Sequence, residues 1–132
     1  VKGNCDFFEE EKMKTSQIFE VKGLKIGVYH GTGISPRAHK PTLQKIAEED
    51  LGCDILIHGH SHEQETFLGE KLLLNPGSCT GAGGGTSNPD NPSMIFLEIT
   101  DEKLKARILE KEGENIIDKN EKTFTSEQLK ET

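Results

Sequence analysis

A short apolar strand that ends in closely spaced histidines places the strongest constraint on how this chain can fold. The run Asp54 to His58 (DILIH) predicts a buried strand, and Gly59-His60-Ser61-His62 follows it directly. Before it, residues 43–51 carry apolar side chains on one face of a helix that begins at Pro41 and ends at Gly52. In layered α/β folds, loops beyond the strand ends gather functional side chains, so this segment indicates both a fold class and a site.

Further apolar runs predict strands on both sides of this unit. Residues 18–21 and 24–30 favour a hairpin that turns at Gly23, and residues 65–68 and 71–74 favour two more strands. A second hairpin is predicted at residues 93–100 and 103–109, where apolar and basic residues alternate in the second half. That alternation indicates one buried and one solvated face.

The sequence predicts the secondary structure at the end of the chain less clearly. After Gly113 it becomes polar, Ile116-Ile117 could add an edge strand, and residues 126–130 form either a short helix or a frayed tail. We therefore expect an α/β sandwich of two mostly mixed sheets that face each other and are flanked by helices. Residues 1–125 would form the domain, and residues 126–132 a polar tail.

Length and charge narrow the function classes. A chain of 132 residues fits one domain, and its net charge of −7 without a basic stripe argues against nucleic-acid or membrane-surface binding. Three cysteines without a CxxC pair favour a reducing, cytoplasmic location, and no apolar run is long enough for a spanning helix. Because the chain opens with Val1 directly before a Gly-Asn motif, we expect it to be a fragment.

Four of the five histidines fall at predicted strand ends. On an extended chain, His60 and His62 would point to one face, where two imidazoles can share a metal ion or serve two adjacent ions. His58 has the same parity but lies within the strand, so it is either a ligand or a packed, supporting histidine. His39 stands in a polar loop, and we expect it to be solvated.

Four short motifs occur in a fixed order: Gly3-Asn4-Cys5-Asp6, His30-Gly31, Gly59-His60-Ser61-His62 and Asn75-Pro76-Gly77-Ser78. The first and last alone indicate only turns. Together, over residues 1–110, they resemble the later motifs of calcineurin-like metallophosphoesterases, particularly the small archaeal and bacterial phosphodiesterases. The chain is also similar to the metallophosphoesterase-fold subunit of retromer, an endosomal sorting complex.

The resemblance implies a phosphoester substrate and a centre of two divalent ions of the Mn, Zn, Fe, Ni or Mg class, with a bridging hydroxide that attacks phosphorus. By similarity, Asn4, His30 and His60 would ligate one ion and His62 the other. Cys5 stands where many family phosphatases carry a histidine that protonates the leaving group. It is either a catalytic proton donor or a small packed residue.

The chain departs from the family in one respect that concerns its activity. The family's first ligands, an Asp-x-His and a bridging Asp, have no counterpart in these residues. We therefore expect the isolated chain to bind metal weakly and to be inactive, unless its own N-terminal half is supplied as a partner.

Two alternatives to the enzyme remain. One is a retromer-subunit-like scaffold with a vestigial metal site and a helical-solenoid sorting subunit as partner. Ser35 and Lys111 stand where that subunit presents apolar partner-binding side chains, which disfavours the same partners. The other is a metal-free remnant that is stabilised by association through an exposed sheet edge.

Overall fold

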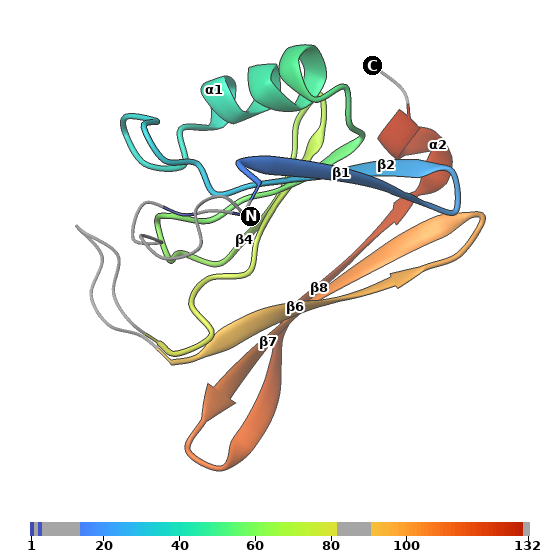
Figure 1. Ribbon diagram of the computed structural model, residues 1–132. Coiled ribbons are helices and arrows are strands. Elements are labelled where there is room, and N and C mark those ends of the chain that lie inside the picture. Colours follow the sequence, from blue (N-terminus) through green and yellow to red (C-terminus); the bar gives the residue numbers. More distant parts are fainter. Residues whose placement is uncertain (2, 4–13, 82–90, 131–132) are drawn as a thin grey trace.

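The computed structural model describes residues 1, 3, 14–81 and 91–130, which form two β-sheets and a few short helices (Figure 1). The first sheet has the strand order β1-β2-β3-β5-β4, and the second has the order β6-β7-β8. The predicted two-sheet α/β fold is confirmed. In chain order the elements are β1 (Ser16–Val21), β2 (Leu24–Tyr29), α1 (Lys40–Lys45), η1 (Ile46–Asp50), β3 (Ile55–Ile57), β4 (Glu65–Leu68), β5 (Leu72–Asn75), β6 (Ser93–Ile99), β7 (Lys103–Glu112), β8 (Asn115–Thr125) and α2 (Ser126–Lys130).

The first sheet joins a hairpin to parallel strands. β1 and β2 are antiparallel, and Lys22 and Gly23 turn between them with φ values of 51° and 79°. Positive φ at both positions is the geometry that two-residue hairpins favour, so Gly23 has the predicted role. β2, β3 and β5 run parallel to one another, and their ends therefore lie at a single edge of the sheet.

The second sheet is wholly antiparallel rather than mixed. Its strands are joined by short turns, which permit only antiparallel pairing, whereas the parallel strands of the first sheet are separated by longer crossovers. The predicted hairpin of β6 and β7 is confirmed. β8 is much longer than the edge strand expected at Ile116-Ile117, because it is formed by pairing with β7 and not by an apolar pattern of its own.

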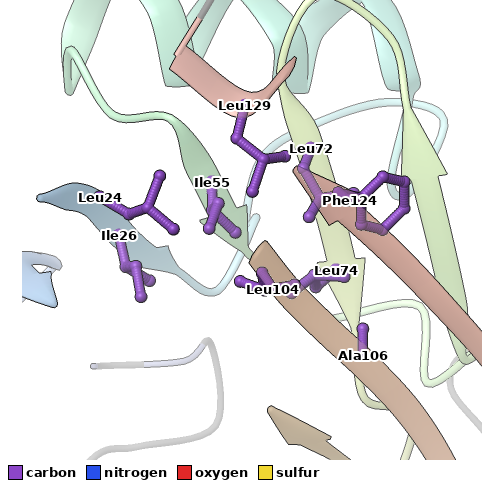
Figure 2. Close-up of a cluster of buried hydrophobic side chains, with 9 residues drawn as sticks. All are labelled: Leu24, Ile26, Ile55, Leu72, Leu74, Leu104, Ala106, Phe124 and Leu129. Atoms are coloured by element: carbon purple, nitrogen blue, oxygen red, sulfur yellow. The ribbon is translucent and has the colours of Figure 1, made fainter. Parts of the chain in front are cut away.

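Two apolar cores lie on opposite faces of the first sheet. The core between the two sheets is drawn in Figure 2 and consists of Leu24, Ile26, Ile55, Leu72, Leu74, Leu104, Ala106, Phe124 and Leu129. The second core lies under the helix and consists of Leu43, Ala47, Cys53, Leu56 and Leu73. The molecule is thus layered as helix, first sheet and second sheet, and β3 and β5 are buried on both faces.

The predicted helix begins near Pro41 as expected, but its second half is wider than an α-helix. α1 passes directly into η1, a π-helical segment, where the Leu51 amide donates to the Ile46 carbonyl at 2.9 Å. Such i to i+5 bonds mark π-helical turns. The Cys53 amide then donates to the Ala47 carbonyl, also at 2.9 Å, and this bond delivers the chain into β3.

Residues 126–130 form a helix, α2, rather than a frayed tail. The Ser126 amide donates to the Glu102 carbonyl at 2.8 Å, and Leu129 is 1% exposed within the core between the sheets. A domain boundary after residue 125 stays a prediction. No helix among the described residues has the length and apolar character needed to cross a membrane.

Candidate metal centre

The histidines gather at the edge where the parallel strands β2 and β3 end. His30 follows Tyr29 at the end of β2, and His58 follows Ile57 at the end of β3. The Gly59 amide donates to the His30 carbonyl at 3.1 Å and so ties the two segments together beyond the last strand pair. The topology therefore brings together side chains that are thirty residues apart in the sequence, as parallel sheets generally do at this edge.

His30 and His60 are in direct contact. Their ring centroids are 4.9 Å apart, and the rings meet edge to face with an interplanar angle of 70°. The Nδ1 atom of His30 lies 2.7 Å from the Thr32 hydroxyl, which orients the ring. Gly31, at φ 97°, allows the chain to leave β2 toward this threonine.

His60 and His62 adopt a backbone geometry that differs from the prediction. Both residues have left-handed backbone conformations, with φ values of 71° and 63°. The expectation that the two rings share a face because the chain is extended is therefore wrong, since the strand ends at Ile57. Left-handed conformations are uncommon for residues with a side chain, and they persist where surrounding contacts hold them.

The electrostatic surroundings of His60 favour its neutral form. Its pKa is lowered, first by partial desolvation and then by the nearby charges of Arg37, His30 and His62. A neutral imidazole is the form that binds a metal ion, so His60 favours the form that a transition-metal site requires. Sequence reasoning missed Arg37 because nothing in the local pattern of the loop indicates that its charge acts on His60.

The other two histidines have different environments. His58 is only 4% exposed, its pKa is lowered to about 4 mainly by burial, and Nδ1 has no hydrogen-bond partner among the described residues. Of the two roles left open for it, this burial matches the packed histidine. His39, expected to be solvated, is half-buried, and its Nδ1 lies 2.9 Å from the Thr42 hydroxyl at the start of α1.

The predicted ligand set is only partly within the described residues. Asn4 and Cys5 lie outside them, so their proposed roles stay predictions. Within residues 1, 3, 14–81 and 91–130, no three His, Cys, Asp or Glu side chains are close enough together to hold an ion. The structure brings His30 and His60 into contact, and the charge of His62 acts on His60.

A calcineurin-like phosphoesterase superfamily domain matches residues 1–102 of the chain. The chain belongs to this family. A probable metallophosphoesterase of Methanothermobacter thermautotrophicus is 36% identical over 110 residues, which cover 83% of this chain and 60% of that protein. A second probable metallophosphoesterase, from Methanocaldococcus jannaschii, is 34% identical over 113 residues, covering 83% of this chain and 52% of the relative. The chain therefore spans about half to three-fifths of these relatives.

Solved structures support the same fold. Vps29 of Entamoeba histolytica, solved with Zn²⁺, matches with a TM-score of 0.78 and 32% identity over 95% of this chain and 67% of that one. A predicted phosphoesterase of Streptococcus pneumoniae matches with a TM-score of 0.74 and 28% identity over 95% of this chain and 68% of that one. The family resemblance drawn from the motifs is thereby confirmed, and so is the predicted likeness to the metallophosphoesterase-fold subunit of retromer, Vps29.

Proposed function

We propose that this chain is the part of a metal-dependent phosphoesterase, acting on phosphodiesters, that carries the later ligands of a binuclear centre. The observation that carries the proposal is the edge-to-face contact of His30 and His60, at 4.9 Å, where two parallel strands end. Family membership supports the reaction class. The cysteine pattern supports a reducing, cytoplasmic setting.

The chain's own residues have distinct tasks in this proposal. His30 and His60 would hold one ion together with Asn4, and His62 would hold the second. The Thr32 hydroxyl beside Nδ1 of His30 fixes the ring so that its other nitrogen can serve as the ligand. When bound, two divalent ions would supply Lewis-acid activation of water and neutralise charge on the phosphate.

Substrate contact and proton transfer fall to side chains that hold no ion. Arg37, whose charge lowers the pKa of His60, would bind a phosphate oxygen with its guanidinium group. Cys5 is the candidate proton donor to the leaving alkoxide. Because the family's Asp-x-His and bridging Asp are not among these residues, tight binding of both ions requires carboxylates from another segment.

The test is hydrolysis of bis(4-nitrophenyl) phosphate by the longest natural chain that contains this sequence, with Mn²⁺ or Zn²⁺ and after chelation. We expect activity that depends on the metal, and a loss of at least about 100-fold in His30→Ala and His60→Ala. His39→Asn is the matched control, because His39 precedes α1 and contacts Thr42, and asparagine suits that capping position.

Two outcomes would contradict the proposal. One is the absence of metal-dependent hydrolysis in the natural chain. The other is equal loss of activity in the His39→Asn control, which would mean that the histidine substitutions act through folding. The 132-residue chain alone, assayed beside the longer one, is expected to bind the ions weakly and to show no turnover.

A scaffold is the second candidate, and one observation favours it. A cavity of about 190 Å³ on the second sheet is lined largely by apolar side chains, among them Met94, Leu109 and Ile116. Lys111 also lines the cavity. At this position we expect the retromer subunit to carry an apolar, partner-binding side chain instead. Capture of a helical-solenoid partner, lost in Ile116→Asp and kept in His60→Ala, would support the scaffold over the enzyme.

A further inference from the structure

A buried amide side chain, that of Asn75, supports the loop that carries His60 and His62. Asn75, the last residue of β5, is 1% exposed. Its Nδ2 donates to the Ser61 hydroxyl at 2.9 Å, and its Oδ1 accepts a hydrogen bond from the Gly77 amide at 3.0 Å. Ser61 lies between the two histidines, so the amide reaches the centre of the loop.

Ser61, which is fixed by Asn75, also forms hydrogen bonds to the residues on either side of it in the loop. Its hydroxyl also accepts a hydrogen bond from the Glu63 amide at 3.2 Å, and its own amide donates to the Gly59 carbonyl at 2.9 Å. Both neighbouring histidines have positive φ, a conformation that a residue with a side chain holds only when its surroundings impose it. The Asn75–Ser61 contact lies where it can impose that conformation.

The turn that follows Asn75 is itself fixed. The Ser93 hydroxyl donates to the Pro76 carbonyl at 2.7 Å, and the Ser93 amide donates to the Ser78 carbonyl at 2.8 Å. Gly77 has φ 82°, and a Cβ atom there would clash with the Ser93 hydroxyl and lie 3.3 Å from Cβ of Gln64. The turn is thus packed between the start of β6 and the histidine loop, which makes it a rigid support.

We propose that Asn75 is a positioning residue that sets the directions of the His60 and His62 rings through Ser61. The inference rests on the proposed metal-dependent function. In that function the two rings must point at the ions, and the strained backbone of His60 and His62 needs outside support to hold the rings in that direction. Asn75 does not contact an ion or the substrate. Supporting residues of this kind typically change metal affinity by about 10- to 100-fold when they are removed.

The experiment combines a metal titration with a measurement that needs no metal. Co²⁺ binding to the longest natural chain is followed by visible absorption, and amide hydrogen exchange is measured without metal. For Asn75→Ala we expect about 10- to 100-fold weaker Co²⁺ binding and faster exchange at Glu63 and Gly77. Unchanged affinity, or unchanged exchange at Glu63, would overturn the inference.

Ser61→Ala is the second variant, since it leaves the Asn75–Gly77 hydrogen bond in place. It should weaken Co²⁺ binding similarly and speed exchange at Glu63 but not at Gly77, and Ser61→Thr should restore affinity. The double variant should bind Co²⁺ no more weakly than the weaker-binding single variant, because both changes remove the same Asn75–Ser61 hydrogen bond. Additive losses would overturn the inference.

Ser93→Ala is the matched control. It removes a hydrogen bond from the same turn but not from the histidine loop, so Co²⁺ affinity should stay at the natural level. A loss equal to that of Asn75→Ala would show a general loosening of the turn and would overturn the positioning role. If the natural chain binds no Co²⁺, the proposed function fails, and the exchange rates alone decide whether Asn75 holds the loop.

Discussion

The parallel strands of the first sheet and the antiparallel ribbon of the second bury their side chains in different ways. All four residues of β5, Leu72 to Asn75, are buried. In β7, by contrast, Leu104, Ala106, Ile108 and Glu110 are buried and alternate with residues that are more exposed. The first sheet is covered by helix on one face and by sheet on the other, whereas the second has one solvated face.

The difference explains where the site lies. Parallel strands end at a common edge, and the loops after β2 and β3 meet there with their histidines. On the second sheet, polar side chains pair with one another. For example, Nη2 of Arg107 donates to Oδ2 of Asp118 at 3.0 Å. The guanidinium carbon of Arg107 also lies 5.7 Å from the centroid of the Phe96 ring. The second sheet therefore contributes to the core, and the first carries the candidate ligands.

The largest effect is expected where the two sheets share a core. Leu104 of β7 is fully buried against the first sheet, so Leu104→Ala should destabilise the fold by about 2–5 kcal/mol through lost burial and a residual cavity. Urea unfolding followed by circular dichroism measures it, with exposed Lys103→Ala as control. If hydrogen exchange in this variant shows β6–β8 opening while β2, β3 and β5 stay protected, the two sheets are not one cooperative unit.

A smaller loss is expected under the helix. A Cβ atom on Gly27 of β2 would lie 2.9 Å from Sγ of Cys53 and 3.2 Å from Cδ1 of Leu51. Gly27→Ala should therefore cost about 1–3 kcal/mol by overpacking, measured by thermal or urea unfolding. Adding Cys53→Ala should recover part of that loss. No recovery would mean that the strain lies elsewhere.

The same core predicts a change with pH. Burial raises the pKa of the Cys53 thiol above its usual value. As the pH rises above about 9, the unfolded chain loses the thiol proton while the folded chain keeps it, so the free energy of unfolding falls. Cys53→Ala should flatten this slope in unfolding curves between pH 8 and 10. Cys79→Ala, at an exposed thiol, should keep the slope of the natural chain.

The smallest effect is expected on the solvated face of the second sheet. The Lys105 ammonium lies 3.5 Å from the Glu121 carboxylate, and both side chains are partly exposed. A double-mutant cycle of Lys105→Ala and Glu121→Ala should give a coupling of under about 1 kcal/mol that decreases in high salt. A larger, salt-resistant coupling would mean that this face stabilises the fold more than its exposure suggests.

Sequence reasoning located most of the strands because their apolar runs are strong. For β8 it offered only the edge strand at Ile116-Ile117, because the eleven residues of that strand are mostly polar and exposed and pairing with β7 sets its length. It also missed the π-helical end of the crossover helix, where helical spacing of the side chains continues although the hydrogen bonds lengthen.

At the candidate site, the sequence proposed His30, His60 and His62 as ligands, and that role stays a prediction. The structure brings His30 and His60 into contact, but strand alternation is the wrong account of how the loop is arranged. Two left-handed residues, and not strand alternation, orient the loop. Arg37 and Asn75 were not recognised as neighbours of the histidine cluster, because a charge in a polar loop and an asparagine before proline look like ordinary surface and turn residues.

The sequence by itself determined the fold class and the family, because apolar spacing and short motifs can be read along the chain, and it proposed the candidate ligands. Only the tertiary structure decided which side chains meet. Parallel pairing of β2 with β3 puts His30 beside His60, and the end of β5 brings Asn75 beneath Ser61. Such contacts join residues far apart along the chain, and strand order and packing, which no local pattern encodes, set their distances.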